Sequence, residues 1–142
     1  MAKLIPVVEE SSILGGGTQA ILGEIAGMLE NLMAGGESGQ IDVRSLPLSP
    51  DELTRLRHML GEGEANIELE LNGTSRCRET AFPAVWWIEH RNADDKVIAE
   101  LIEVARVPDI LAYDDDEITD GIESLNLRLT PAAGKLEESN HE

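Results

Sequence analysis

The sequence predicts an α+β fold in which about three helices pack on a mainly antiparallel sheet of four to five strands. Two observations carry this prediction. Four strand-like segments follow one another between residues 67 and 107 and are joined by short turn sequences, a pattern typical of antiparallel sheets. Segments with helical periodicity or helix-start signals stand on either side of this run, at residues 18–35, 49–60 and 114–129.

The first helix is predicted to begin at Thr18, which can cap it, and to end at Gly35-Gly36. Its apolar residues recur at helical spacing, and they are Ile21, Leu22, Ile25, Met28, Leu29, Leu32 and Met33. Residues 1–17, with Gly15-Gly16-Gly17 at their end, have a linker composition and are predicted to form a flexible N-terminal arm. The alternative is that the apolar residues of this arm dock on the sheet, as a further strand or as a lid.

The second helix has the most complete start signal in the chain, and a short strand at residues 41–44 precedes it. Ser49 is a good N-cap, Pro50 suits the first helical position, and Glu52 completes a capping box with Ser49. Gly61 is expected to end this helix. Its buried face is predicted to consist of Leu53, Leu56 and Leu60.

The run of strands begins at residues 67–71, where apolar side chains alternate with glutamates, so one face of this strand is expected to be buried. Asn72-Gly73 is a favoured hairpin turn and leads into a strand at residues 76–82. The third strand covers residues 85–91. The last strand, residues 97–107, has apolar side chains on both faces, which predicts a central and covered position.

Beyond the sheet, residues 108–111 are predicted to form a helical turn. Asp114 and the acidic residues that follow it favour a helix N-terminus, where the helix dipole stabilises negative charge. The buried stripe of this helix is predicted to consist of Ile118, Ile122, Leu125 and Leu129. Residues 130–142 are predicted to be a disordered acidic tail, so the folded domain is expected to cover residues 18–129.

The net charge of −17 is the strongest feature of the composition. Nucleic acid is bound mainly through Lys and Arg, so this charge argues against nucleic acid as a partner, and it also argues against an anionic membrane surface. No apolar run approaches the roughly 20 residues of a membrane span, and the N-terminus lacks a hydrophobic segment of signal-peptide length. These observations predict a cytoplasmic protein.

Neither a metal centre nor a catalytic residue is predicted from the residue pattern. His58, His90 and His141 are scattered, and the chain has no Cys-x-x-Cys motif. Cys77 is the only cysteine, and its arginine neighbours project to the opposite face of the predicted strand, so we expect a small buried hydrophobe and not a nucleophile. We therefore expect no cofactor and no enzymatic activity.

The adjacent pair Trp86-Trp87 points instead to recognition. Neighbouring residues on a strand point to opposite faces, so the two indoles cannot share one core. One is expected to pack inward, and the other to be covered by another element or by a partner protein. With the charged residues around the pair, the predicted partner-binding set is Trp86, Trp87, Glu79, Arg91, Glu103 and Arg106. The alternative is that these charges form cross-strand ion pairs on a solvated face.

Several short motifs occur in an order that is similar to the order of motifs in one known protein family. They lie at residues 41–49 (IDVRSLPLS), 61–64 (GEGE), 78–80 (RET), 83–87 (PAVWW) and 103–108 (EVARVP). Over residues 18–129 the chain resembles the C-terminal domain of HupH/HyaF-type proteins, which are accessory proteins in the maturation of nickel-iron hydrogenases. Longer members of that family carry additional sequence before this domain, whereas this chain has only the short arm.

The resemblance implies a client and a neighbour. The family is implied to assist the small, iron–sulfur-carrying subunit of the hydrogenase before it joins the large subunit, beside a thioredoxin-like accessory protein. No catalytic residue set comes with the family. The sequence thus leads to the hypothesis of a non-enzymatic chaperone that binds the small subunit precursor through its Trp-containing hairpin. The alternative is a scaffold that bridges other maturation factors without contacting the hydrogenase.

Overall fold

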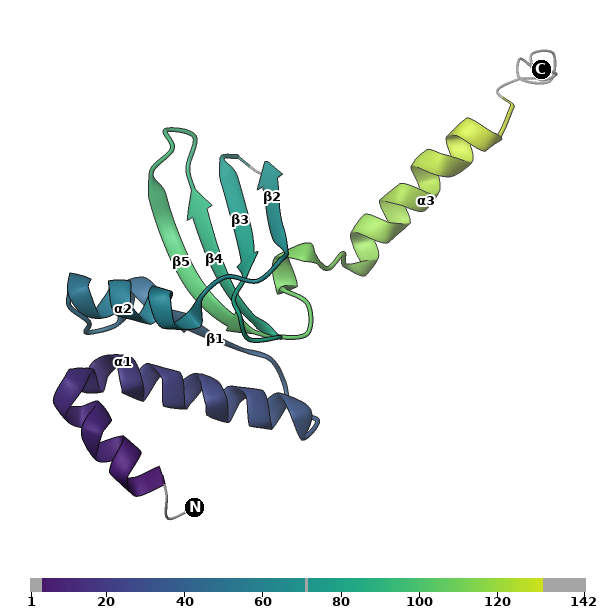
Figure 1. Ribbon diagram of the computed structural model, residues 1–142. Coiled ribbons are helices and arrows are strands. Elements are labelled where there is room, and N and C mark those ends of the chain that lie inside the picture. Colours follow the sequence, from purple (N-terminus) through teal and green to yellow (C-terminus); the bar gives the residue numbers. More distant parts are fainter. Residues whose placement is uncertain (1–3, 71, 132–142) are drawn as a thin grey trace. The chain divides into compact units, whose positions relative to one another are not determined.

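The computed structural model describes residues 4–70 and 72–131, and within these ranges it describes side chains from residue 16 onward. The elements, in chain order, are α1 (Leu4–Met33), β1 (Gly39–Asp42), the short 3-10 helix η1 (Val43–Ser45), α2 (Pro50–Leu60), β2 (Asn66–Glu70), β3 (Thr74–Glu79), β4 (Val85–Arg91), β5 (Val97–Val104), the 3-10 helix η2 (Asp109–Leu111) and α3 (Asp115–Leu129) (Figure 1). The chain divides into two compact units, Met1–Pro108 and Asp109–Glu142, and each is described by itself.

The first unit contains a five-stranded sheet in the order β1-β5-β4-β3-β2, in which all neighbouring strands are antiparallel. This confirms the predicted α+β class with a mainly antiparallel sheet. β5 lies between β1 and β4, so it is an inner strand, as the apolar content of both its faces predicted. The register places Ile41 of β1, Ile102 of β5 and Trp87 of β4 in one row across the sheet.

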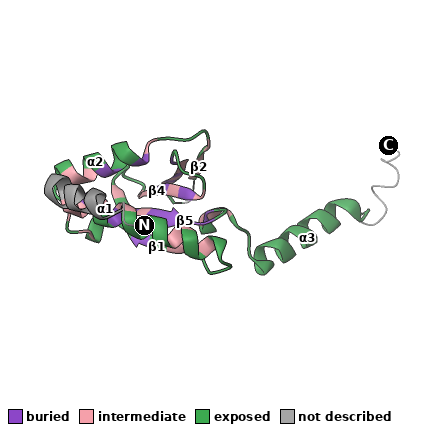
Figure 2. Cartoon of the chain, turned by 60° about the horizontal axis from the view of Figure 1, so that its bottom comes forward, coloured by how far each residue is buried: buried purple, intermediate pink, exposed green. Residues whose placement is uncertain are grey.

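Helices α1 and α2 pack on the face of the sheet that carries Ile41, Ile102 and Trp87. The core lies between these helices and the sheet. Figure 2 shows the buried residues concentrated where the helices and strands meet. The buried cluster consists of Ile21 and Ile25 from α1, Leu56 and Leu60 from α2, and Ile41, Val43, Val85, Trp87, Ile102 and Val104 from the sheet and η1. Most of these residues are β-branched or leucine, which pack well against a pleated surface.

Helix α2 matches its sequence signals closely. The Ser49 side chain accepts a hydrogen bond from the Glu52 N–H, the Glu52 side chain accepts one from the Ser49 N–H, and Pro50 stands at the first helical position. Gly61 ends the helix with a φ of 67°, a left-handed value that glycine adopts without strain. The capping box at Asp114 and Glu117 begins α3 in the same way.

The predicted start of the first helix is wrong, because α1 begins at Leu4 and not at Thr18. Thr18 lies inside the helix with 0% exposure, and its hydroxyl donates a hydrogen bond to the Glu52 carbonyl oxygen over 3.1 Å. Gly17 is a contact point as well, since a Cβ there would lie 2.8 Å from Cδ2 of Leu48. Gly17 therefore permits close packing of α1 against Leu48 and does not belong to a linker.

The predicted N-terminal arm and C-terminal tail stay predictions. Residues 1–3 and 132–142 lie outside the described residues, and no side chain before residue 16 is described. Strand limits also differ from those predicted, and β3 covers Thr74–Glu79 where residues 76–82 were predicted. β1 ends at Asp42 because its carboxylate accepts a hydrogen bond from the Arg44 N–H (3.2 Å), which turns the chain into η1. β5 ends at Val104, and Ala105 then donates its N–H to the Ala84 carbonyl (2.9 Å).

The predicted buried stripe of the last helix is also wrong. The four residues are between 52% and 68% exposed, and they are Ile118, Ile122, Leu125 and Leu129. The periodicity identified a true amphipathic helix, but the described part of the second unit contains only η2 and α3 and therefore has no element that could cover the stripe.

Candidate functional site

The two tryptophans lie on opposite faces of β4, as the alternation of side chains predicted. Trp87 is 7% exposed and belongs to the core under α1 and α2. Trp86 is half-buried on the other face, where its Nε1–H donates a hydrogen bond to the Ala105 carbonyl over 3.1 Å. The prediction that one indole packs inward and the other is more accessible is confirmed.

The polar edge of Trp87 is held by a small charged network. Its Nε1–H donates to Oε2 of Glu100 over 2.9 Å, and the Arg57 guanidinium donates to the same oxygen over 3.4 Å. The Arg57 guanidinium also lies over the indole, 4.8 Å from the ring centroid, in a cation–π arrangement. Glu100 is only 8% exposed, so these two donors compensate the burial of its carboxylate.

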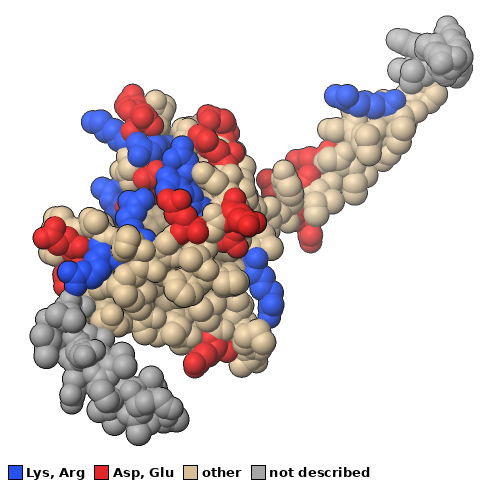
Figure 3. All heavy atoms as spheres, viewed as in Figure 1, with Lys and Arg blue, Asp and Glu red and all other residues tan. Residues whose placement is uncertain are grey.

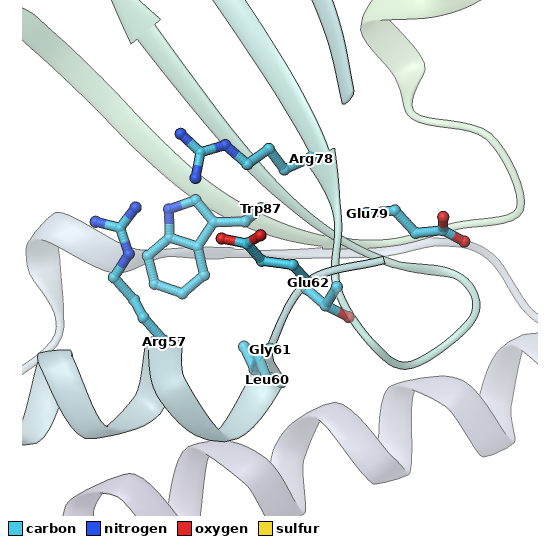
Figure 4. Close-up of a pocket in the computed structure, with 8 residues that line it drawn as sticks. Arg57, Leu60, Gly61, Glu62, Arg78, Glu79 and Trp87 are labelled. Atoms are coloured by element: carbon cyan, nitrogen blue, oxygen red, sulfur yellow. The ribbon is translucent and has the colours of Figure 1, made fainter. Parts of the chain in front are cut away.

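A pocket of about 120 Å³ opens beside this network, between the end of α2 and strands β3 and β4. Its lining consists of Arg57, Leu60, Gly61, Glu62, Arg78, Glu79, Thr80 and Trp87. Figure 4 shows the indole between the two arginine side chains, with the Glu62 carboxylate turned toward the ring. Among the described residues, none forms a hydrogen bond or an ion pair with the Arg78 guanidinium. We call this hollow the arginine pocket.

The loop after α2 fixes one wall of the arginine pocket. The Gly63 N–H donates to the Glu79 carbonyl oxygen over 2.7 Å, and Oε1 of Glu79 accepts the N–H groups of Glu64 and Ala65, each over 3.2 Å. A Cβ on Gly63 would lie 2.5 Å from the Thr80 carbonyl oxygen, so the close approach of this loop to β3 requires glycine. The carboxylate of Glu79 thus clamps the loop and points away from the pocket (Figure 4).

The structure divides the six predicted partner-binding residues into two groups and one outlier. Trp87 and Arg91 lie on the face covered by the helices, whereas Trp86 stands in one row with Glu79 and Glu103 on the opposite face. Arg106 is exposed beyond the end of β5. The six residues therefore do not form one patch.

Within these groups the charged side chains are engaged to different degrees. The Arg91 Nε–H lies 3.1 Å from Oε1 of Glu89, and this hydrogen bond and the charge of Glu89 raise the pKa of Arg91. Glu103 is only 1% exposed. Arg91 and Glu89 lie on the same strand, so their ion pair is not one of the cross-strand pairs that the alternative predicted.

Sequence reasoning missed three residues of the arginine pocket, Arg57, Glu62 and Arg78. Glu62 and Arg78 belong to motifs that carry the family resemblance, Gly61-Glu62-Gly63-Glu64 and Arg78-Glu79-Thr80. These motifs did not by themselves indicate that the two residues line a pocket. Arg57 flanks the leucine stripe of α2, and only the packing of α2 on β4 brings it over Trp87.

The unpartnered guanidinium of Arg78 can donate hydrogen bonds to an acceptor that enters the pocket. Cys77 is fully buried, and burial, with the nearby negative charge of Glu103, raises the pKa of its thiol, so the neutral form is favoured. This confirms that Cys77 is a small buried residue.

In the described part of the chain, no three His, Cys, Asp or Glu side chains gather as a potential metal site. Within that part, no helix combines the length and apolar character needed to cross a bilayer.

Comparison with known proteins identifies relatives of this architecture. Residues 17–131 match the family described as "HupH hydrogenase expression protein, C-terminal conserved region". The hydrogenase expression/formation protein HupH of Rhodobacter capsulatus is 34% identical over 86 residues, which are 61% of this chain and 31% of that protein. HoxQ of Azotobacter vinelandii is 29% identical over 85 residues, 60% of this chain and 30% of that protein.

One solved structure is similar to this chain in both amino-acid sequence and fold. The hydrogenase expression protein HupH from Thiobacillus denitrificans is 42% identical, with a TM-score of 0.75 over 80% of this chain and 95% of the solved chain. The chain spans about a third of the length of the curated relatives that it matches.

Proposed function

Because this chain belongs to the family of the HupH C-terminal conserved region, we propose that it is a non-enzymatic accessory protein in the maturation of nickel-iron hydrogenase. Its relatives carry the names of hydrogenase expression and formation proteins, which supports this role. The residues of the arginine pocket support recognition, since buried Trp and Arg side chains are the residue types that contribute most to protein–protein binding.

The client that we propose is the precursor of the iron–sulfur small subunit, held before it joins the large subunit beside a thioredoxin-like accessory protein. One observation carries the choice of binding surface. The arginine pocket presents a guanidinium, that of Arg78, with no partner among the described residues, next to an indole that is already fixed by Glu100 and Arg57. A rigid aromatic wall with an available charge loses little entropy when it binds.

The second candidate function is a scaffold that bridges other maturation factors without contacting the hydrogenase. The exposed apolar stripe of α3 favours it, because a bridging protein needs a second binding surface besides the arginine pocket. The two functions differ in whether the hydrogenase small subunit is bound directly.

Co-purification from cells that express the hydrogenase operon tests the choice. The tagged chain is expected to retain the small subunit precursor, and Arg78→Ala is expected to release it without loss of fold. Arg128→Ala removes an exposed arginine of α3 and is the matched control. Recovery of other accessory proteins without the small subunit, checked by chemical cross-linking, would exclude direct binding and establish the scaffold.

A further inference from the structure

An apolar groove adjoins the arginine pocket. It lies between α1 and the loop that joins β3 to β4, has a volume of about 250 Å³ and is lined by Leu22, Ile25, Ala26, Leu29, Leu60 and Phe82. Leu60, at the end of α2, lines both hollows and forms a wall that they share. Figure 3 shows the charged side chains gathered over the sheet on this side of the molecule, above a largely uncharged surface.

Phe82 forms an exposed wall of the groove and is held in place by its neighbours. It is 47% exposed. Its N–H donates to Oγ1 of Thr80 over 3.1 Å, and the Ala81 N–H donates to the Leu60 carbonyl oxygen over 2.8 Å. These hydrogen bonds anchor the backbone of the loop, and a large aromatic side chain left exposed on an anchored loop is a characteristic feature of binding surfaces.

The charged side chains that line the arginine pocket are two arginines and two glutamates, namely Arg57, Arg78, Glu62 and Glu79. Oε1 of Glu79 accepts two backbone N–H groups of the loop. Arg57 is already bound to Glu100, which leaves the donors of Arg78 available for a partner. The volume of about 120 Å³ suits one carboxylate side chain and is too small for a nucleotide.

We propose that the two adjoining hollows recognise a single segment of the client, in which an acidic side chain lies beside a bulky apolar side chain. The acidic side chain binds Arg78 at the arginine pocket, and the apolar side chain fills the groove between Ala26 and Phe82. The identity of the client rests on the proposed function, whereas the chemistry of the segment rests on the two hollows.

Substitution of Glu62 tests whether the ligand of the arginine pocket is negatively or positively charged. Its carboxylate faces the ring of Trp87 in the same pocket as Arg78, so it repels an acidic ligand and attracts a basic one (Figure 4). Glu62→Gln therefore strengthens the binding of an acidic segment, while Arg78→Ala weakens it. A basic segment would respond in the opposite direction to both substitutions.

The probe is a random peptide library displayed on phage and selected against the full chain. The selected peptides are expected to share an Asp or Glu within a few positions of Leu, Ile, Met or Phe. One such peptide is then synthesised, and its affinity is measured by calorimetry for each variant, with circular dichroism as the check of folding.

Arg78→Ala is expected to weaken the peptide roughly tenfold to a hundredfold, the size of one lost charge-assisted hydrogen bond. Ala26→Glu places a charge in the apolar groove and is expected to weaken it by at least about tenfold. Two exposed sites outside both hollows provide the controls, and Ala20→Glu on α1 and Arg128→Ala on α3 are expected to leave affinity unchanged.

The outcomes separate this inference from the proposed function. Peptides without an acidic residue, no selected peptide at all, or weaker binding after Glu62→Gln would overturn the inference even where the precursor co-purifies. Self-association that Ala26→Glu abolishes would assign the groove to a second copy of this chain and would also overturn it. Selection of the expected peptides without retention of the precursor would refute the proposed client and leave the recognition chemistry standing.

Discussion

At the scale of single residues, Trp87 joins the core to the proposed binding site. Its ring packs among the buried residues under α1 and α2, while its Nε1–H and its face hold Glu100 and Arg57 at the edge of the arginine pocket. The stability of the fold and the proposed recognition therefore involve the same side chain. A variant of Trp87 that loses client binding cannot by itself separate the two roles, which is why Arg78 is the better probe of binding.

Trp87→Ala is expected to lower the free energy of unfolding by about 3–5 kcal/mol, because it leaves a cavity in the core. Trp86→Phe keeps a smaller aromatic ring on the other, half-buried face and removes the hydrogen bond to Ala105, so it is expected to cost about 1 kcal/mol. Denaturation by guanidinium measures both. Equal losses from the two substitutions would contradict the assignment of Trp87 alone to the core.

Cys77 is expected to react very slowly with thiol reagents in the folded chain. Burial and Glu103 raise the pKa of its thiol in the folded state, so the thiol contributes stability that is fully present at neutral pH. That contribution is lost as the pH rises past the ordinary thiol pKa, because the unfolded chain then ionises first.

Two measurements check this expectation for Cys77. Thiol labelling is compared in the native chain and in the chain unfolded by guanidinium, where reaction should be immediate. The decline of stability toward alkaline pH should be smaller in Cys77→Ala than in the unsubstituted chain. Rapid labelling under native conditions would show that Cys77 is accessible and would contradict its burial.

At the scale of elements, the pairing of α1 with α2 depends on two small residues. Gly17 permits the close approach of Leu48, and the hydroxyl of Thr18 satisfies the Glu52 carbonyl next to the start of α2. Neither role is visible in the apolar stripe that predicted the first helix. Gly17 and Thr18 instead resemble a linker end and a helix cap in sequence.

Thr18→Val keeps the shape of the side chain and removes this hydrogen bond. It is expected to cost about 1 kcal/mol, the net value of one hydrogen bond, because the Glu52 carbonyl loses the Thr18 donor. Thr54→Val is the control, since Thr54 is exposed on α2. Thermal unfolding of both variants provides the measurement, and a Thr18→Val chain as stable as the control would show that the contact contributes nothing.

At the scale of the whole molecule, the predicted folded domain, residues 18–129, remains to be tested. The contact of Gly17 with Leu48 shows that a shortened chain should keep this residue. We expect residues 16–131 to fold with the melting temperature of the full chain, since they contain every residue of the buried core cluster. Calorimetry of the two chains gives the comparison.

Limited proteolysis of the full chain complements that comparison. Early cleavage before Gly17 with no change in melting temperature would agree with the predicted arm. Protection of residues 1–15, or a large loss of stability in the shortened chain, would show instead that this segment belongs to the domain.

The sequence by itself determined the elements that depend on local chemistry. The capping box at Ser49, the helix start at Asp114, the end of α2 at Gly61 and the limits of β4 were all predicted, because capping, backbone freedom at glycine and the alternation of side chains act within a few residues. The same alternation predicted that Trp86 and Trp87 face opposite ways. The family resemblance in turn located the motifs that line the site.

Only the tertiary structure decided which residues meet. Arg57 and Arg78 lie on different elements, and it is the packing of α2 on strands β3 and β4 that brings both to Trp87. Periodicity shows that a helix has an apolar face but not what covers that face, so it predicted burial for Ile122 of α3, which is exposed, as readily as for Ile25 of α1, which is buried. Contacts between residues distant in the chain depend on how the layers stack, and no local pattern carries that information.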